Sequence, residues 1–133
     1  MKNLTLADIG TIQNLIYKAA GFRQPLANLR EIFITGGEGV MSDCGSAMLL
    51  LDFVYKDHTP TAHIAAIPGF RGSRFVDFIK EGMEEARRRG YQEVYSHQPN
   101  ENYDRRLRLL VGALGGVLVS RETDPERVYK ISL

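Results

Sequence analysis

A run of nine residues that is almost continuously apolar, Ala47–Tyr55, constrains the fold of this chain more than any other feature. Periodicity cannot separate a buried strand from a buried helix over so short a run, but the turn signals that flank it favour a strand. A second apolar segment, Thr61–Ile67, follows the turn at 56–60 and ends at Pro68-Gly69. A strand that is apolar on both sides needs cover on both sides. We therefore predict two central antiparallel strands in a mixed sheet with helices on both faces.

Helical patterns precede and follow these strands. Thr5-Leu6-Ala7-Asp8 resembles a capping box and opens a helix that runs to about Ala20. Pro25 suits the first turn of a second helix, which is closed by Gly36-Gly37. Two further helices, with apolar side chains recurring on one face, are expected at about 73–89 and 103–114. Amphipathic helices of this kind need a sheet to cover.

Shorter strands complete the predicted order of elements. They are expected near Val40–Asp43, at 91–97, at Val117–Glu122 and at Arg127–Leu133. The strand at 91–97 should lie parallel to the one at 61–67, because a whole helix separates them and right-handed crossovers dominate. The chain thus reads as two helices, three strands, a helix, a strand, a helix and two strands. This order predicts an α/β (α+β) fold with a central mixed sheet.

Composition limits the size and class of the protein. A length of 133 residues predicts a single domain, 1–133. The 17 Lys and Arg and 16 Asp and Glu residues leave a net charge of +1, which argues against nucleic-acid and membrane-surface partners. Cys44 is the one cysteine, so neither a disulfide within the chain nor a multi-cysteine metal site is expected. With no apolar signal core and no long apolar run, these features indicate a cytoplasmic protein.

The segment between the second central strand and the long helix, Ile67–Val76, carries the chemistry. A strand that runs into a glycine-containing loop and then a helix directs several backbone N–H groups and the positive end of the helix to one point. That point suits a phosphate or pyrophosphate, and Arg71 and Arg74 could add charge-assisted hydrogen bonds to the same anion. We therefore predict an anion site where the helix begins, near Gly72.

This loop resembles the pyrophosphate loop of the GNAT superfamily of acetyl-CoA-dependent N-acetyltransferases. The residues that match are Pro68, Phe70, Arg71 and Gly72, and the order of elements is similar over about residues 38–133. The resemblance implies a GNAT-like acyl-CoA N-acyltransferase fold, acetyl-CoA or coenzyme A as cofactor, and an amine of a small molecule or peptide as substrate. It implies cofactor contacts at Ala66, Ile67, Arg71, Gly72, Ser73, Arg74, Phe75, Val76 and Asn102.

The chain departs from the family pattern at three positions. Arg74 stands where the family prefers glycine, and Val76 stands where it prefers glycine or alanine. Val111 stands where the family has a tyrosine that often protonates the leaving thiolate. These departures leave an alternative open: a non-catalytic module that keeps the fold, still binds coenzyme A and serves as a binding or structural part, as in degenerate versions among tailed-phage proteins. The terminal strand pair could also join a second copy edge to edge, which would give a homodimer.

Acetyl transfer to an amine needs a polarised carbonyl, a neutral amine and an acid for the departing sulfur. A backbone N–H near Ile67 is expected to polarise the carbonyl. His63 is the first candidate base, because it lies on the strand that leads into the loop and an imidazole titrates near neutral pH. His97 and then Asp52 follow as candidates. The candidate acids are Tyr103 and Tyr95. The alternative interpretation of each is a side chain that only packs or hydrogen-bonds within the fold.

Overall fold

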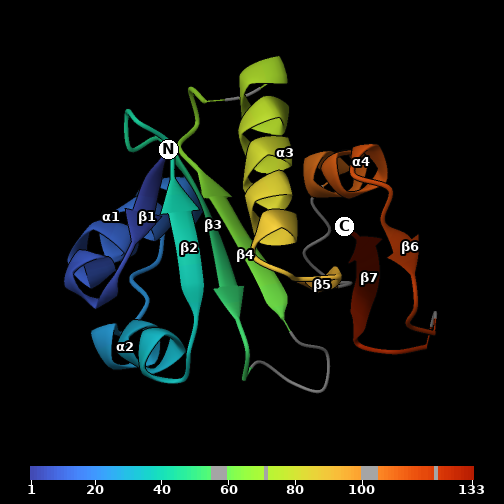
Figure 1. Cartoon of the computed structure of the whole chain (residues 1–133), viewed down its shortest axis with the longest axis horizontal. Coiled ribbons are helices and arrows are strands. Elements are labelled where there is room, and N and C mark those ends of the chain that lie inside the picture. The colour runs from blue at the N-terminus through green and yellow to red at the C-terminus, as the bar shows by residue number, and fades with distance from the viewer. Residues whose placement is uncertain (55–59, 71, 100–104, 122) are drawn as a thin grey trace.

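The computed structural model describes residues 1–54, 60–70, 72–99, 105–121 and 123–133 (Figure 1). In chain order its elements are β1 (Lys2–Leu4), the 3-10 turn η1 (Leu6–Asp8), α1 (Ile9–Ala20), α2 (Leu26–Ile34), β2 (Glu38–Met41), β3 (Ala47–Asp52), β4 (Thr61–Ala66), α3 (Ser73–Arg88), β5 (Glu93–Pro99), α4 (Arg105–Ala113), β6 (Val117–Leu118) and β7 (Glu126–Ser132). All four helices expected from the sequence are present among these elements.

The strands form one mixed sheet in the order β1-β2-β3-β4-β5-β7-β6. The two central strands, β3 and β4, pair antiparallel over their whole length, from Ala47 opposite Ala66 to Asp52 opposite Thr61. β4 and β5 are parallel neighbours joined by the crossover through α3, and the other neighbouring strands pair antiparallel. Both pairings predicted for the central strands are therefore confirmed.

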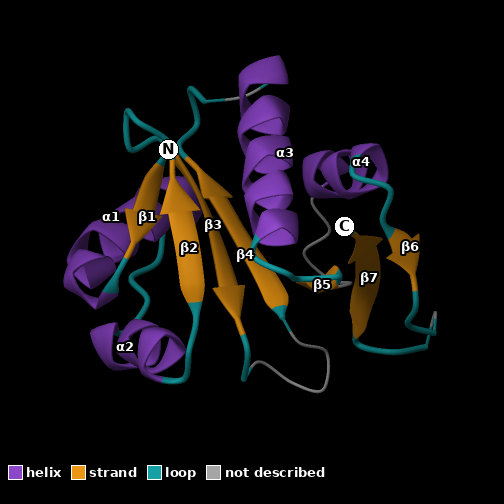
Figure 2. Ribbon diagram, in the orientation of Figure 1, coloured by secondary structure: helices purple, strands orange, loops and turns teal. Residues whose placement is uncertain are grey.

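Helices cover both faces of this sheet, with α1 and α2 on one face and α3 and α4 on the other (Figure 2). Every residue of β3 is buried, as its apolar sequence predicts. Its side chains alternate between the layers, so that Leu49 packs in the core beneath α3 and Met48 packs in the core beneath α1 and α2. Gly82 allows α3 to lie close to β3, since a Cβ at this position would lie only 2.8 Å from Cδ2 of Leu49.

The N-terminal segment shows which features are local and which depend on the sheet. The predicted capping box is confirmed, because the N–H of Thr5 donates to Oδ2 of Asp8 at 2.8 Å. α1 ends at Gly21, whose φ of 80° suits a residue without a side chain. β1 is absent from the order expected from the sequence. Its three residues are too few to show alternation, and they become a strand because Asn3 pairs with Val40 at the edge of β2.

The C-terminal strands agree with expectation in order but not in length. β6 comprises only Val117–Leu118, the beginning of the strand expected at 117–122, whereas β7 spans Glu126–Ser132. In the ranges that the structure describes, no helix has both the length and the apolar character needed to cross a membrane.

Candidate functional site

The parallel strands β4 and β5 touch at one end and diverge toward the other. Thr61 pairs with Tyr95, whose backbone N–H donates to the carbonyl of Pro60 at 2.9 Å. Beyond this pair no further register between the two strands exists among the described residues. The C-terminal ends of β4 and β5 are therefore splayed.

The edge of β4 that faces this gap carries backbone N–H and C=O groups that are not paired with β5 beyond Thr61. The N–H of Ile67 donates to the carbonyl of Ser46 at 2.9 Å, on the β3 side. Because backbone groups alternate between the two edges of a strand, the N–H and C=O groups of Ile64 and Ala66 point to the β5 side. The Ile67 N–H is engaged within the sheet, so the N–H near Ile67 that faces the gap is that of Ala66.

The loop after β4 brings the chain to the positive end of α3. Gly72 precedes the helix with φ 71° and ψ −144°, a conformation that is nearly restricted to glycine. No acidic residue occupies the first turn of α3, and the N–H groups of that turn have no partner within the helix. A glycine before the helix and unpaired N–H groups in its first turn are the features that the predicted anion site requires.

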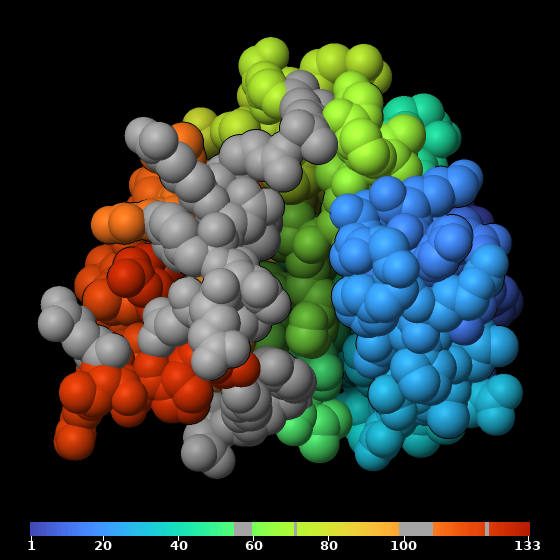
Figure 3. All heavy atoms as spheres, turned by 180° about the vertical axis from the view of Figure 1, so that it is seen from behind, coloured from blue at the N-terminus to red at the C-terminus, as the bar shows by residue number. Residues whose placement is uncertain are grey.

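A cleft of about 1000 Å³ lies along the gap. In the space-filling view its floor, which includes the green β4, lies between the blue N-terminal helices and the orange-red C-terminal strands (Figure 3). The predicted site residues that line it are His63, Ala66, Ile67, Gly72, Phe75, Val76 and His97. Ser73 and Arg74 are exposed and are not part of its lining. The guanidinium of Arg74 stacks 5.0 Å from the ring centre of Phe70. Arg71, Asn102 and Tyr103 lie outside the described residues.

The candidate bases on the central strands form a pair inside this cleft. Nε2 of His63 lies 3.4 Å from Oδ2 of Asp52, and the other carboxylate oxygen of Asp52 accepts the N–H of Val54 at 2.9 Å. Burial lowers the pKa of His63 below its ordinary value, and this effect outweighs the Asp52 carboxylate, which raises it. The charge of His97 lowers the pKa of His63 further. The imidazole of His63 is therefore held neutral at physiological pH.

The second histidine is anchored from the opposite side of the gap. Nδ1 of His97, on β5, lies 3.1 Å from Oε2 of Glu126, on β7, and the His97 side chain is only 4% exposed. His97 and His63 both line the cleft. The structure thus brings together the first two candidate bases named from the sequence.

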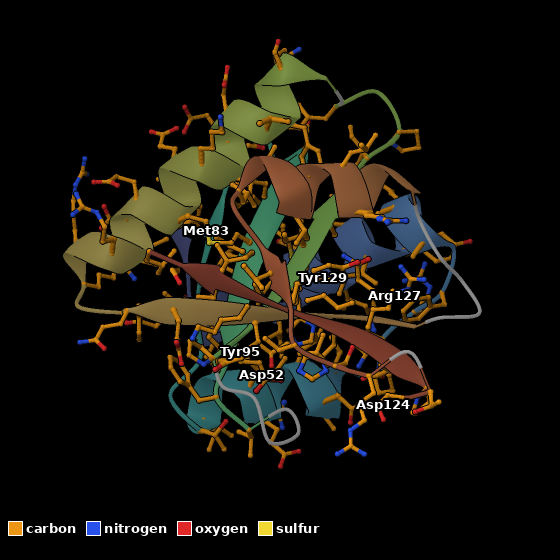
Figure 4. The ribbon with its side chains drawn as sticks, turned by 90° about the vertical axis from the view of Figure 1, so that its right-hand side faces the viewer. Asp52, Met83, Tyr95, Asp124, Arg127 and Tyr129 are labelled. Atoms are coloured by element: carbon orange, nitrogen blue, oxygen red, sulfur yellow. The ribbon has the colours of Figure 1, made fainter. Side chains whose placement is uncertain are left out.

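Tyr95, one of the two candidate acids, lies apart from the lining of the cleft. It occupies the same row of the sheet as Asp52, with Thr61 of β4 between them, because Thr61 pairs with both residues; Figure 4 labels Tyr95 and Asp52. The Tyr95 hydroxyl donates to Oε1 of Glu93 at 2.9 Å, and this hydrogen bond raises the pKa of the phenol. The phenol is therefore committed to a neighbour on its own strand.

Two further residues of the cleft have positions that sequence reasoning does not reveal. Gln98, on β5, is 5% exposed, and neither its Nε2 nor its Oε1 has a hydrogen-bond partner among the described residues. Val111, on α4, is 1% exposed and lines the same cleft. An unpartnered buried amide is costly, which makes Gln98 a candidate for contact with a ligand. No sequence signal marks it, because its isolation depends on how β5, β7 and α4 pack.

No family model matches the sequence, and no curated protein matches it. Solved structures match it over nearly its whole length, and they show that the fold is that of the GNAT N-acetyltransferases. The chain is similar to the GNAT domain of PAT from S. lividans, with a TM-score of 0.73 and 13% identity over 99% of this chain and 89% of that chain.

Two further structures have the same fold. The ribosomal-protein-S18-alanine N-acetyltransferase from Escherichia coli has a TM-score of 0.69 and 14% identity, over 99% of this chain and 93% of that chain. The PaiA N-acetyltransferase from Thermoplasma acidophilum, solved in complex with coenzyme A, has a TM-score of 0.68 and 10% identity, over all of both chains. The fold class predicted from the sequence is therefore confirmed.

Proposed function

We propose that this chain is an N-acetyltransferase that moves the acetyl group of acetyl-CoA to an amine of a small molecule or peptide. One observation carries the proposal: the gap between β4 and β5 connects the N-terminus of α3 to a neutral histidine, His63, within a single cleft. An anion site, a strand edge that accepts an extended arm and a base are what this reaction requires of a protein.

The residues present fit such a cofactor. The backbone N–H groups at the start of α3, with Gly72 before them, would hold the pyrophosphate. The edge of β4 at Ile64 and Ala66 would pair with the amide-containing arm in the manner of an added strand. From the opposite strand, the Gln98 side chain would donate a hydrogen bond through its Nε2 and accept one through its Oε1, which matches the C=O and N–H of an amide in that arm. Acetyl-CoA, when bound, supplies an acetyl group activated as a thioester.

The side chains of the cleft would then handle the proton. The Asp52 carboxylate can only accept a hydrogen bond, so it favours the hydrogen of His63 on Nε2 and leaves Nδ1 as the basic nitrogen. Nδ1 of His63 would take one proton from the ammonium of the bound acceptor, which frees the nitrogen electron pair to bond to the acetyl carbon. As the carbon–sulfur bond breaks, the second surplus proton of the nitrogen would pass to the departing sulfur. The Ala66 N–H, which is the one near Ile67 that faces the gap, would polarise the carbonyl.

A specific observation also favours the non-catalytic alternative, a module that binds coenzyme A without transferring acetyl groups. Val111 is buried and apolar where the family resemblance implies a proton-donating tyrosine. A valine cannot protonate a departing thiolate, so the reaction would lack the general acid that a tyrosine at this position supplies. We therefore expect a slow enzyme, and binding without turnover is the outcome that would select the alternative.

The proposal extends to partners and location. The apolar edge strand β6, with Val117 64% exposed and Leu118 43% exposed, would pair with the same strand of a second copy to form a homodimer, which sedimentation would detect. The exposed thiol of Cys44 accords with the reducing cytoplasm.

The test of the function is a transfer assay with mass-spectrometric detection of the acetylated amine. Cys44 is exposed and would react with thiol reagents, so a direct product measurement is preferable to following the free thiol. We expect acetylated product from acetyl-CoA and at least one amine of a mixed library, and little or none from His63→Gln. Binding of acetyl-CoA without any acetylated amine would instead support the non-catalytic module.

A further inference from the structure

The part of the cleft on the α1 and α2 side is built largely from apolar side chains. Those contributed by the two helices and by β3 include Ile16, Ala19, Leu29, Ile32, Met48 and Leu50. Of the described residues that line the whole cleft, only Glu31 and Asp52 carry a formal charge, and neither lysine nor arginine is among them. A ligand that enters this side meets an apolar wall and negative charge.

Asp52 is the buried charge of this region. The residue is 6% exposed and lies at the end of β3, where Val54 N–H and His63 are its hydrogen-bond partners. Among the described residues no lysine or arginine forms an ion pair with it. The imidazole beside it is held neutral by burial, so it does not balance the carboxylate. A buried carboxylate without a counter-charge is costly, and a cation that enters the cleft would lower that cost.

We propose that the acceptor is a small primary amine on an apolar body, held by its ammonium against Asp52 and by its carbon skeleton against the α1 and α2 wall. This proposal rests on the acetyltransferase function and names the substrate class of that same site. It excludes free α-amino acids, because a carboxylate next to the amine would be repelled by Asp52 and would find no basic side chain among the described lining residues. It also disfavours polyamines, because Asp52 is the one buried carboxylate among the described lining residues and additional ammonium groups would meet only the apolar wall or the exposed Glu31.

The test is equilibrium binding in the presence of coenzyme A, so that no acetyl group is transferred. Four probes share or lack the proposed features: phenethylamine, phenethyl alcohol, phenylalanine and spermidine. We expect phenethylamine to bind at least about tenfold more tightly than each of the other three, the ratio that about 1.4 kcal/mol produces. Binding of the alcohol as tight as that of the amine would overturn the role of the charge, and tighter binding of spermidine or phenylalanine would overturn the substrate class.

Two variants distinguish a specific effect of the Asp52 carboxylate from the effect of any negative charge at the cleft. Asp52→Asn keeps an oxygen for the Val54 N–H but removes the charge, and it should reduce the preference for phenethylamine over phenethyl alcohol to about twofold or less. The matched control is Glu31→Gln, which removes the exposed charge at the same cleft and should leave that preference unchanged. An unchanged preference in Asp52→Asn would overturn the assignment, and the wild-type panel remains decisive if this variant does not fold.

A peptide acceptor is a further outcome of the same measurement. A short amidated peptide with an N-terminal phenylalanine carries the same amine and ring with peptide bonds beyond them. If it binds more than about tenfold more tightly than phenethylamine, the proposal of a small amine is wrong. Coenzyme A is titrated in parallel: if it binds while the amine shows no preference, only this inference fails, whereas absence of coenzyme A binding removes the proposed function itself.

Discussion

Nε2 of His63 lies 3.4 Å from Oδ2 of Asp52, and the two residues belong to the neighbouring antiparallel strands β4 and β3. This relationship orients the imidazole, favours the tautomer with hydrogen on Nε2, and puts a carboxylate beside the proposed path of the amine. Burial nevertheless keeps the imidazole neutral, because it lowers the pKa of His63 more than Asp52 raises it. One pair of residues thereby supplies both the base and the counter-charge of the proposed site.

Acetyl transfer should depend on pH through His63. Because the base must be neutral, kcat/KM should rise with pH along a limb whose midpoint lies below about 6.5, the ordinary pKa of histidine, and should level off above it. His63→Gln should lower kcat/KM by about 10²–10⁴-fold and abolish this limb. Initial rates across the pH range measure both effects. Full activity with the wild-type pH profile in the variant would reject His63 as the base.

The stability of the protein should fall with acid through the same residue. The pKa of His63 is lower in the folded state than in the unfolded chain, so the unfolded chain binds more protons between the two values. The free energy of unfolding should therefore decrease as the pH falls below about 6.5, until the folded imidazole is also protonated. Denaturant titrations at a series of pH values measure this slope. If His63→Gln has the same slope as the wild type, another group is responsible.

Gln98→Leu should stabilise the free protein and weaken coenzyme A binding. Replacing the buried, unpartnered amide with an apolar side chain of similar size removes a desolvation penalty of about 1–3 kcal/mol, so the melting temperature should rise. Loss of the hydrogen bonds that Gln98 would make to the ligand should weaken coenzyme A binding by about 0.5–1.5 kcal/mol. Gln92→Leu, at an exposed position, is the matched control and should change neither quantity. Unchanged affinity in Gln98→Leu would mean that the amide does not contact the ligand.

Gly72→Ala should weaken both the fold and the anion site. At φ 71° and ψ −144° an alanine would cost about 1–3 kcal/mol, and relief of this strain would displace the N–H groups at the start of α3. Coenzyme A affinity should fall together with the free energy of unfolding. The control, Gly10→Ala in α1, has open space around the new Cβ and should stabilise the helix by about 0.5–1 kcal/mol. Equal effects of the two substitutions would remove the special role of Gly72.

The features predictable from the sequence are those that depend on neighbours along the chain. Thr5 and Gly21 mark the limits of the first helix through a capping box and a left-handed residue, both of which are local. β3 was recognisable because its burial on both faces leaves an unbroken apolar run. β1 was not, because its three residues form a strand only through their register with β2.

The candidate site likewise contains features that local sequence predicts and features that depend on strand register. Gly72 could be predicted, since a strand, a glycine loop and a helix follow one another in sequence. The proximity of His63 to Asp52 depends on the register of β3 against β4, and that of His97 to Glu126 depends on the register of β5 against β7. Gln98 could not be predicted, because an amide is unpartnered only with respect to the elements that pack around it.

The most direct test of the central claim is a calorimetric titration of acetyl-CoA into the purified protein. We expect saturable binding of one acetyl-CoA per chain, weakened in Gly72→Ala and in Gln98→Leu, because the start of α3 and the gap between β4 and β5 form one site. Heat of dilution alone, with acetyl-CoA raised into the millimolar range, where binding free energy is only about −4 kcal/mol, would contradict the proposed function.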